Sequence, residues 1–280
     1  MSDSDVALSG EITERAWAKI NLTLQITGRR PDGYHELESL VVFAEVGDVL
    51  TLSRLEGHEV ELSIGGPQAG PLLGEADNLV LRAARGLARA CGSGAGAAMT
   101  LTKNLPVASG IGGGSADAAA TLRLLKRVWA VEISDSALRQ LALKLGADVP
   151  MCLLSEPARV SGIGEDIAPV NAMPACGMLL VNPGIEVPTP AVFRALTRRD
   201  NPPLPQIPAS GFAEFDALVG WLRETRNDLE PAARGIVPEI AEVLSVLEMQ
   251  GEVAFARMSG SGATCFALTR PRAGAAELSA

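Results

Sequence analysis

Polar and apolar residues alternate near the start of the chain. Over residues 15–27 every second position is apolar, and the positions between are mostly polar. Successive side chains of a strand point to opposite faces, so this alternation predicts a β-strand. The face opposite the apolar one would carry Trp17, Lys19, Asn21, Thr23 and Gln25. A turn is predicted at Pro31-Asp32-Gly33, and apolar segments at residues 40–43 and 49–53 predict two further strands.

Helix signals frame three segments in the middle of the chain. Asp77 and Asn78 precede a helical pattern that runs to about Cys91 and ends at Gly92. Ser134 opens a later helix, which should end at Gly146. Between these two, an alanine-rich helix would place a stripe of apolar side chains on one face, made of Ala118, Leu122, Leu125 and Trp129.

The remaining segments carry a mixture of strand and helix patterns. Strands are predicted at residues 97–103, 151–154, 159–162, 178–181, 253–258 and 263–268, and helices near residues 212–223 and 238–250. A proline-rich connection covers residues 201–208. We therefore expect a mixed α+β chain with a domain boundary between Ser155 and Met178.

The composition indicates a folded and acidic protein. Hydrophobic residues make up 47% of the 280 residues and charged residues 20%, which supports a substantial core and argues against disorder. The formal net charge of −9 argues against sequence-independent binding of nucleic acid, because that requires a basic surplus. An anionic substrate would need donors aimed at it locally.

The cysteines, histidines and first residues narrow the cellular setting. Four scattered cysteines without a C-x-x-C pair are typical of a reducing cytosol and offer neither a zinc site nor a disulfide framework. With His35 and His58 as the only histidines, a histidine-built metal centre is not expected. The acidic N-terminus lacks the features of a signal peptide, and no apolar run reaches membrane-spanning length. We expect a cytoplasmic protein that binds neither nucleic acid nor a membrane.

The strongest chemical signal is the segment Leu105-Pro-Val-Ala-Ser-Gly-Ile-Gly-Gly-Gly-Ser-Ala-Asp-Ala-Ala-Ala-Thr-Leu122. Glycines let backbone N–H groups approach a ligand, and the helix start adds unpaired N–H groups and the positive end of the helix dipole. A phosphate is the expected ligand. The segment lacks the lysine of a P-loop, and Ser115 stands where a dinucleotide fingerprint needs its third glycine. The alternative is a flexible turn before a helix.

Candidate catalytic residues lie on the first strand and after the helix that ends at Gly146. Lys19 and Asn21 share a strand face, and a lysine there can balance charge on a transferring phosphate. The alternative is a solvated polar face. The helix dipole disfavours a negative charge at Asp148, so this carboxylate should seek a cation, for which Lys19 is the candidate. Such a pair can take a proton from a substrate hydroxyl; the alternative is a polar cap between helix and strand.

Aromatic residues suggest a nucleobase site. Tyr34 and His35 follow the turn and can offer a flat face and a hydrogen-bond donor, while Phe193 can close the base from the other side. In each case the alternative is an aromatic residue that packs on the core. The segment Ser259-Gly-Ser-Gly-Ala263 taken alone is typical of a hairpin turn.

Together these segments resemble the GHMP kinases, a family of small-molecule kinases. The family resemblance is carried by Pro-x-x-x-Gly-x-Gly-Gly-Gly-Ser at residues 106–115, Leu145-Gly-Ala-Asp-Val-Pro150 and Gly260-Ser-Gly-Ala263. The Tyr34-His35 pair and Val187-Pro-Thr189 are similar to the cytidine-binding branch of the family, and Ala18-Lys-Ile-Asn21 matches the first motif of one subfamily. Asp32-Gly-Tyr-His35 and Asp77-Asn-Leu79 add to the match through their order and spacing along the chain. The substrate of that branch is a cytidine diphosphate-linked methylerythritol of the non-mevalonate isoprenoid pathway.

The resemblance implies a fold of two domains. Residues 1–160 would be similar to ribosomal protein S5 domain 2, and residues 161–280 would form a ferredoxin-like domain. The family carries a further helix and strand after its last glycine turn, whereas this chain stops at Ala280, so the last strand can be missing. The protein would be a monomer or a weak homodimer.

The resemblance also implies the roles of individual residues. The phosphates of ATP would lie on Pro106, Val107, Ala108, Ser109, Gly110, Ile111, Gly112, Gly113, Gly114, Ser115 and Ala116, with Asn78 near the adenine. Lys19 and Asp148 would be catalytic, and the substrate would be bound by Asn21, Tyr34, His35, Thr189, Pro190 and Phe193. Mg2+ would arrive with ATP, without an assigned ligand; Asp117 would either bind it or favour the helix start. The alternatives are a GHMP kinase for homoserine, mevalonate or a sugar, and a non-catalytic ligand-binding protein.

Overall fold

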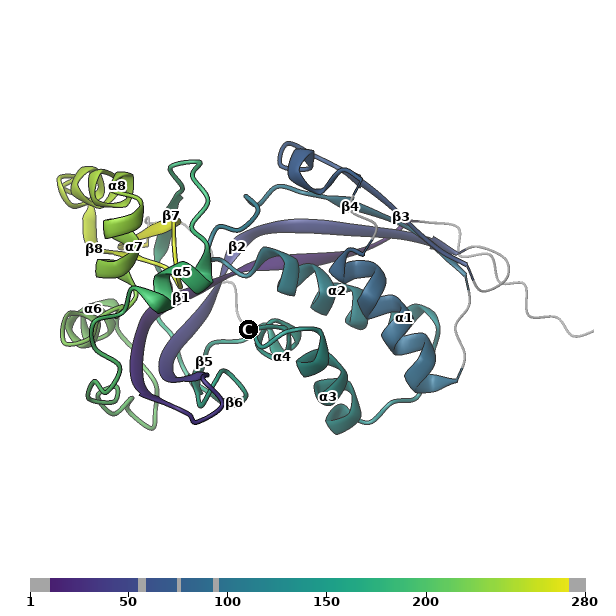
Figure 1. Cartoon of the computed structure of the whole chain (residues 1–280), viewed down its shortest axis with the longest axis horizontal. Coiled ribbons are helices and arrows are strands. Elements are labelled where there is room, and N and C mark those ends of the chain that lie inside the picture. Colours follow the sequence, from purple (N-terminus) through teal and green to yellow (C-terminus); the bar gives the residue numbers. More distant parts are fainter. Residues whose placement is uncertain (1–10, 55–58, 75–76, 93–95, 272–280) are drawn as a thin grey trace, which may run out of the picture. The chain divides into compact units, whose positions relative to one another are not determined.

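Helices and strands are mixed along the whole chain, as the sequence predicts (Figure 1). The computed structural model describes residues 11–54, 59–74, 77–92 and 96–271, so His58 and the residues that bear on a missing last strand lie outside the described part. The strands are β1 (Ile12–Arg29), β2 (His35–Arg54), β3 (Val60–Gly65), β4 (Ala97–Thr102), β5 (Ala158–Ser161), β6 (Asp166–Pro169), β7 (Gly177–Val181), β8 (Val253–Met258) and β9 (Cys265–Thr269). The helices are α1 (Leu79–Cys91), α2 (Gly113–Val128), α3 (Asp135–Leu145), α4 (Val149–Leu154), α5 (Thr189–Arg194), α6 (Phe215–Arg223), α7 (Glu230–Ile236) and α8 (Glu239–Glu248), with a 3-10 turn at Gly70–Leu72.

Strand β1 is buried on both of its faces. Its apolar face is buried as the alternation predicts, and Ile20 and Ile26 are fully inaccessible. The opposite face is buried as well, because Lys19 and Asn21 are each 5% exposed. A solvated polar face is therefore excluded for these two residues, whose polar groups need partners inside the protein.

The prediction of two strands at residues 40–43 and 49–53 is wrong, because both segments belong to the single strand β2. The glycine between them, Gly47, does not break the strand. A Cβ at this position would lie 2.3 Å from the carbonyl oxygen of Ala16 in β1. Gly47 therefore permits a close approach of two backbones, which is a common role of glycine inside a strand.

The prediction of a strand at residues 151–154 is also wrong, because these residues form helix α4. A short apolar run does not distinguish a buried strand from a buried helix, and Pro150 suits the first turn of a helix. Asp148 directly precedes α4, so its carboxylate lies where the dipole of that helix favours a negative charge. Asp148 thus lies between the C-terminus of α3, as predicted, and the N-terminus of α4, whose dipole the sequence prediction did not include.

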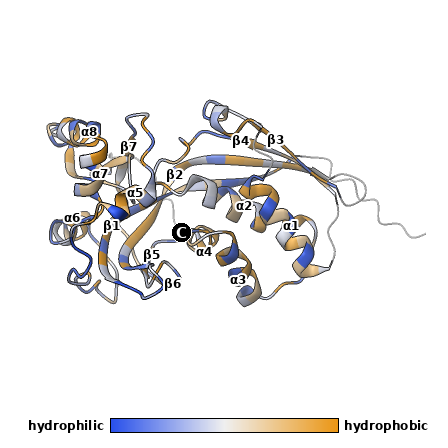
Figure 2. Ribbon diagram, in the orientation of Figure 1, coloured by the Kyte–Doolittle hydropathy of each residue, from blue (hydrophilic) through white to orange (hydrophobic). Residues whose placement is uncertain are grey.

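The predicted boundaries of the other helices in the first half are confirmed. The Asn78 side chain accepts a hydrogen bond from the Val80 N–H at 2.8 Å, and Gly92 ends α1 with a φ of 63°. Ser134 caps α3 through the N–H of Ala137. Helix α1 is amphipathic, with hydrophilic and hydrophobic residues on different sides (Figure 2). The elements β3, β6, α5 and α7 were not predicted, although Val60, Leu62 and Ile64 of β3 alternate with polar residues and give a strand signal that could have been used.

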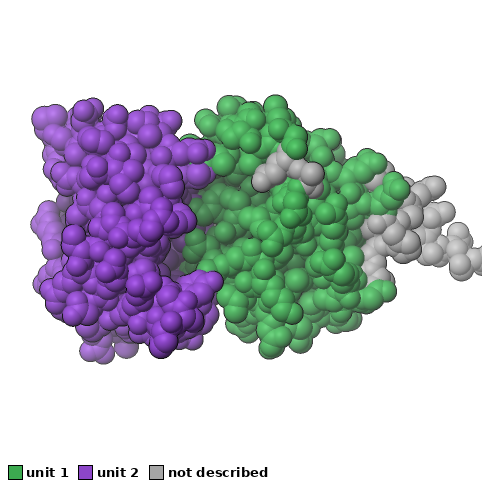
Figure 3. Space-filling model, viewed as in Figure 1, with its two compact units in different colours: residues 1–18, 45–107, 112–155 green, residues 19–44, 108–111, 156–280 purple. Residues whose placement is uncertain are grey.

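The chain forms two compact units, which are coloured separately in Figure 3. The first unit comprises residues 1–18, 45–107 and 112–155, and the second comprises residues 19–44, 108–111 and 156–280. Both β1 and β2, which pair with each other, contribute residues to each unit.

In the first unit, β4 pairs antiparallel with the second half of β2 and parallel with β3. Helices α1 and α2 pack side by side next to these strands (Figure 1). The predicted apolar stripe of α2 faces the core, since Ala118, Leu122 and Leu125 are fully buried.

In the second unit, β5 pairs antiparallel with the first half of β2 and with β6. A separate antiparallel sheet has the strand order β7-β9-β8, and α8 packs against β8 and β9. Ile240 and Leu244 of α8 belong to the hydrophobic cluster that joins this helix to the sheet. No helix in the described ranges is long and apolar enough to cross a membrane.

Candidate active site

Two glycine turns meet backbone to backbone in the second unit. Gly110 has a φ of 76° and Gly260 a φ of 56°, which is the left-handed region that favours glycine. A Cβ at Gly110 would lie 2.6 Å from the carbonyl oxygen of Gly262, and a Cβ at Gly260 would lie 2.7 Å from that of Gly110. The Ser259 hydroxyl donates to the Gly110 carbonyl at 3.2 Å. Residues 108–111 and the turn at residues 259–262 therefore pack so tightly that both need glycine.

Strand β1 joins this pair of turns through two predicted site residues. The Lys19 N–H donates to the Ile111 carbonyl at 3.0 Å, and the Asn21 N–H donates to the Ser259 hydroxyl at 3.0 Å. The structure thus brings Lys19 and Asn21 together with part of the glycine-rich loop and with the later glycine turn. These three segments lie far apart in the sequence and share one small region of the second unit.

The side chain of Asn21 is held in one orientation. Its Nδ2 donates to the Ser39 hydroxyl at 2.7 Å, and that hydroxyl donates to the Thr23 carbonyl at 2.5 Å. The amide oxygen consequently faces the backbone of Gly260, where a Cβ would lie 3.3 Å away from it. Ser39 is fully buried and was not singled out from the sequence, because a lone serine in a strand carries no chemical signal.

The first unit contains the other part of the glycine-rich loop. Gly112, with a φ of 66°, is the N-terminal cap of α2, and no acidic residue lies in the first turn of this helix. The first N–H groups of a helix lack partners within it, and the helix dipole is positive there, so this end is suited to bind an anion. The contact of Pro106, Val107 and the other loop residues with ATP stays a prediction.

Asn78 has a structural role in the first unit. Its side chain is 6% exposed and its Oδ1 caps helix α1. The contact of Asn78 with the adenine stays a prediction.

An aromatic pair forms at the start of β2. The ring centroids of His35 and Phe193 are 5.0 Å apart, with an angle of 32° between the ring planes. Burial lowers the pKa of His35, and the charges of Arg29 and Arg199 lower it further, so the imidazole is neutral at pH 7. Its Nε2 is buried without a hydrogen-bond partner among the described residues. Tyr34 is 62% exposed.

The start of α5 is bonded to the later glycine turn. The hydroxyls of Thr189 and Ser261 are 2.7 Å apart, and Pro190 lies in the first turn of α5. Asn227 braces the same turn from another side, since its Nδ2 donates to the carbonyls of Met258 and Gly260 at 2.9 and 2.8 Å. The turn is therefore more than a simple hairpin connection.

The two predicted catalytic residues belong to different units. Lys19 lies on β1 in the second unit, and Asp148 is an exposed residue at the start of α4 in the first. Their pairing stays a prediction.

A buried ion cluster in the first unit was not predicted. Lys103 Nζ bonds to a carboxylate oxygen of Asp48 and, at 2.9 Å, to one of Asp117. Asp117, which lies just after the first turn of α2, is therefore bonded to Lys103. Nothing in the sequence pattern connects Asp48 with Lys103, which are 55 positions apart.

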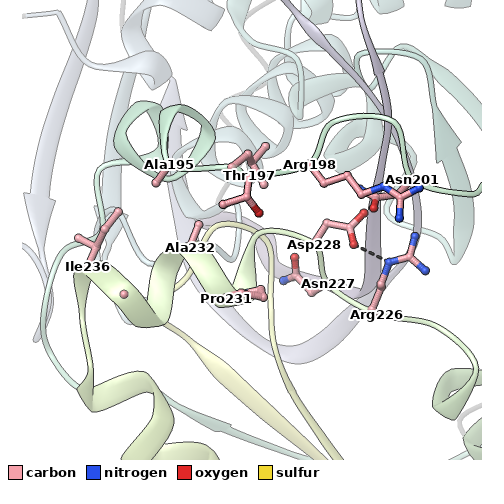
Figure 4. A pocket seen from close by; sticks show the side chains of 12 residues that line it. Ala195, Thr197, Arg198, Asn201, Arg226, Asn227, Asp228, Pro231, Ala232 and Ile236 are labelled. Carbon is pink, nitrogen blue, oxygen red and sulfur yellow. Dashed lines mark hydrogen bonds and ion pairs between the residues drawn. The ribbon is translucent and has the colours of Figure 1, made fainter.

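A cavity of about 540 Å3 opens in the second unit beside α5 and α7 (Figure 4). Its charged side chains include Arg198, Arg226 and Asp228, and Arg226 Nε donates to Asp228 at 2.6 Å. Ala195, Pro231 and Ala232 line its apolar side. None of the residues predicted for the site lines this cavity.

The donor set for magnesium is sparse. Within the described ranges, no three His, Cys, Asp or Glu side chains cluster in a way that would hold a metal ion. Asp117, which could have favoured a metal, is bonded to Lys103 instead. No described residue is therefore assigned as a ligand of Mg2+.

Comparison with known proteins agrees with this arrangement. The models of the GHMP kinase N-terminal and C-terminal domains match residues 78–156 and 204–280. A protein of Cereibacter sphaeroides named 4-diphosphocytidyl-2-C-methyl-D-erythritol kinase is 54% identical over 90% of this chain and 87% of its own length. A protein of the same name from Paracoccus denitrificans is 54% identical over 91% of this chain and 86% of its own length.

Solved structures give the same picture. The crystal structure of a 4-(cytidine 5'-diphospho)-2C-methyl-D-erythritol kinase is 34% identical, covers 92% of this chain and 90% of its own, and superposes with a TM-score of 0.74. The homoserine kinase of Cytophaga hutchinsonii shares the fold: it is 18% identical, the match covers 97% of this chain and 89% of the homoserine kinase, and the TM-score is 0.67. With its two glycine turns, its Lys19–Asn21 segment and these relatives, the chain belongs to the GHMP kinases, in the 4-diphosphocytidyl-2-C-methyl-D-erythritol kinase family.

Proposed function

We propose that this protein transfers the γ-phosphoryl group of ATP to the 2-hydroxyl of 4-diphosphocytidyl-2-C-methyl-D-erythritol, a step of the non-mevalonate isoprenoid pathway. The observation that carries the proposal is the junction in the second unit, where Lys19 and Asn21 are bonded to both glycine turns. The names of relatives that are 54% identical over most of the chain support the choice of substrate.

Phosphoryl transfer requires mainly positioning and stabilisation of charge. The phosphates would lie on residues 106–116, where backbone N–H groups and the start of α2 attract an anion. Lys19 would balance charge on the transferring group, and Asn21 would orient the acceptor. The buried setting of both residues strengthens these interactions, because surrounding water would weaken them.

Asp148 would orient the acceptor hydroxyl and take its proton. The acceptor is a tertiary alcohol, which is a weak acid. Proton loss to Asp148 would therefore accompany or follow formation of the P–O bond. Mg2+, bound with ATP, would neutralise charge on the phosphates.

The cytosine would lie beside His35 and Phe193. Phe193 offers a ring face, and the neutral imidazole of His35 has one donor and one acceptor nitrogen. The unpartnered Nε2 supports a polar contact with the edge of the base. Tyr34, which is exposed, would cover the other face of the cytosine once the substrate binds.

We further propose that the protein acts in the cytoplasm as a monomer or a weak homodimer. All four cysteines are free, which suits a reducing compartment.

The test is a phosphorylation assay with ATP and the cytidyl-erythritol substrate, run beside mevalonate and homoserine. Turnover of the cytidyl substrate, without turnover of mevalonate or homoserine, supports the proposal. Turnover of another alcohol that cytidine nucleotides do not inhibit would show instead that the protein is a GHMP kinase for that alcohol. Asp148→Asn should lower kcat by roughly 100-fold or more while the affinity for both substrates stays the same. Near-normal turnover of this variant would remove Asp148 as the base.

A further inference from the structure

The proposed reaction does not by itself account for the buried ion cluster of the first unit. It consists of Lys103, which follows β4, Asp48 of β2 and Asp117 of α2. Lys103 and Asp117 are each 2% exposed, and Asp48 is fully buried. Burying three charges is costly, and such clusters add little net stability compared with apolar packing. The consequence of this cluster is therefore geometric.

One carboxylate holds the chain that enters the glycine-rich loop. Asp48 Oδ1 accepts hydrogen bonds from the N–H groups of Asn104 at 2.6 Å and Leu105 at 2.8 Å. The Asn104 side chain adds a bond to the Gly47 carbonyl at 3.0 Å. The two residues ahead of Pro106 are thus fixed to β2.

The other carboxylate holds the chain that leaves the loop. Asp117 lies just after the first turn of α2 and bonds to Lys103 Nζ through Oδ2, while its Oδ1 is buried without a partner among the described residues. A Cβ at Gly113 would lie 3.2 Å from the same Nζ and 3.8 Å from Asp48 Oδ2. The first residue of α2 therefore lies directly against the ammonium group.

The lysine itself is held firmly at its backbone. The Lys103 N–H donates to the Gly65 carbonyl at 2.8 Å, and its carbonyl accepts from the Gln68 N–H at 3.0 Å. The side chain extends from this fixed point to both carboxylates, so one ammonium group links the entering and leaving ends of the loop.

We propose that Lys103, with Asp48 and Asp117, is a positioning residue for the nucleotide: it fixes both ends of the glycine-rich loop so that the N–H groups at the start of α2 are in place before ATP binds. The inference rests on the proposed function, in which those N–H groups receive the phosphates. A site that is ordered in advance loses less entropy on binding, so its affinity is higher. Release of the loop should weaken the binding of ATP and leave the binding of the alcohol substrate intact.

The test uses the whole protein and three variants. Asp117→Asn keeps the size of the side chain and a bond to Lys103 but removes the negative charge that Asp117 carries above about pH 7, so the variants are compared at pH 8. Lys103→Met removes the link altogether. Arg123→Met is the matched control: Arg123 lies further along α2, is partly buried, and bonds to Glu14 and to the Cys152 carbonyl at 2.8 Å.

Titration calorimetry with ATP in the absence of the second substrate gives the dissociation constant directly. Lys103→Met should raise this constant about tenfold and Asp117→Asn about threefold, and Arg123→Met should leave it unchanged. In the steady state, KM for ATP should rise by the same factors while KM for the cytidyl substrate stays within about twofold.

Two results would overturn the inference. One is an unchanged affinity for ATP in folded Asp117→Asn, whether or not Lys103→Met folds. The other is an equal loss of affinity in Arg123→Met, which would reveal a general effect of destabilising α2. Absence of ATP binding by the unaltered protein would instead refute the proposed function, so the two failures are distinguishable.

Discussion

The contact between the two glycine turns makes a sharp prediction for Gly110→Ala. A Cβ at this position would lie 2.6 Å from the Gly262 carbonyl oxygen and 2.8 Å from that of Ser259, which are backbone atoms that cannot rotate away. The φ of 76° adds the cost of a left-handed conformation, about 1 kcal/mol for alanine. Forcing extra volume into a packed site costs about 1–3 kcal/mol more. We expect a total loss of about 2–4 kcal/mol in the free energy of unfolding.

The same change should reduce activity. If the turns separate, the bond from Ser259 to the Gly110 carbonyl is lost and the Ile111 carbonyl moves away from the Lys19 N–H. A displacement on the order of 1 Å at a phosphate site costs about 100-fold in rate. We therefore expect kcat/KM to fall by about this factor.

Gly184→Ala is the matched control. Gly184 has nearly the same φ, 77°, and a Cβ there would have no heavy atom within 4 Å. It should lose only the conformational term of about 1 kcal/mol and keep full activity. Urea denaturation followed by circular dichroism gives the two free energies. Equal stability of the two variants, together with normal turnover of Gly110→Ala, would refute the role of the contact.

Three further predictions concern other parts of the protein. Phe193→Leu should raise KM for the cytidyl substrate about tenfold and leave KM for ATP unchanged, whereas Phe212→Leu, at a different aromatic pair, should change neither in kinetic assays. Burial raises the pKa of Asp117 to about 7, so the folded state retains a proton that the unfolded state loses near pH 4. The free energy of unfolding of the unaltered protein, relative to that of Asp117→Asn, should therefore fall as pH rises from 4 to 7, by at most about 1.4 kcal/mol per pH unit. A difference in denaturation midpoints that does not change with pH would contradict this. Arg257 makes four buried hydrogen bonds to Leu22, Leu222 and Thr225. Arg257→Met should therefore lower the free energy of unfolding by about 2–4 kcal/mol. The control, Arg223→Met at an exposed position, should lower it by less than about 0.5 kcal/mol in the same denaturation experiment.

Much of the fold could be predicted because local signals determine it. Asn78 and Ser134 mark helix starts through their own side chains, and Gly92 marks a helix end through its own φ. The alternation in β1 likewise depends on neighbouring positions alone. The strand predicted at residues 151–154 is wrong because four apolar residues suit either structure, and the bonding that decides between them is not visible in so short a run.

The ion cluster could not be predicted for a different reason. Asp48 and Lys103 are 55 positions apart, and each alone resembles an ordinary charge at the end of a strand. Their meeting depends on the pairing of β2 with β4, which places residues 49–54 beside residues 97–102. A single sequence contains no measure of this pairing.

The case of Lys19 and Asn21 shows what burial adds to a sequence pattern. Alternation identifies a polar face of β1 but not what covers it, and for a lone lysine on such a face a solvated face is the more usual interpretation. In the structure this face is covered, and a covered polar face must be supplied with partners. Asn21 obtains them from Ser39 and Ser259, and the Lys19 N–H obtains one from Ile111. Ser259 and Ile111 belong to the two glycine turns, so the bonds that satisfy the backbone N–H groups of this buried strand hold the candidate catalytic residues beside the loop that is suited to bind phosphate.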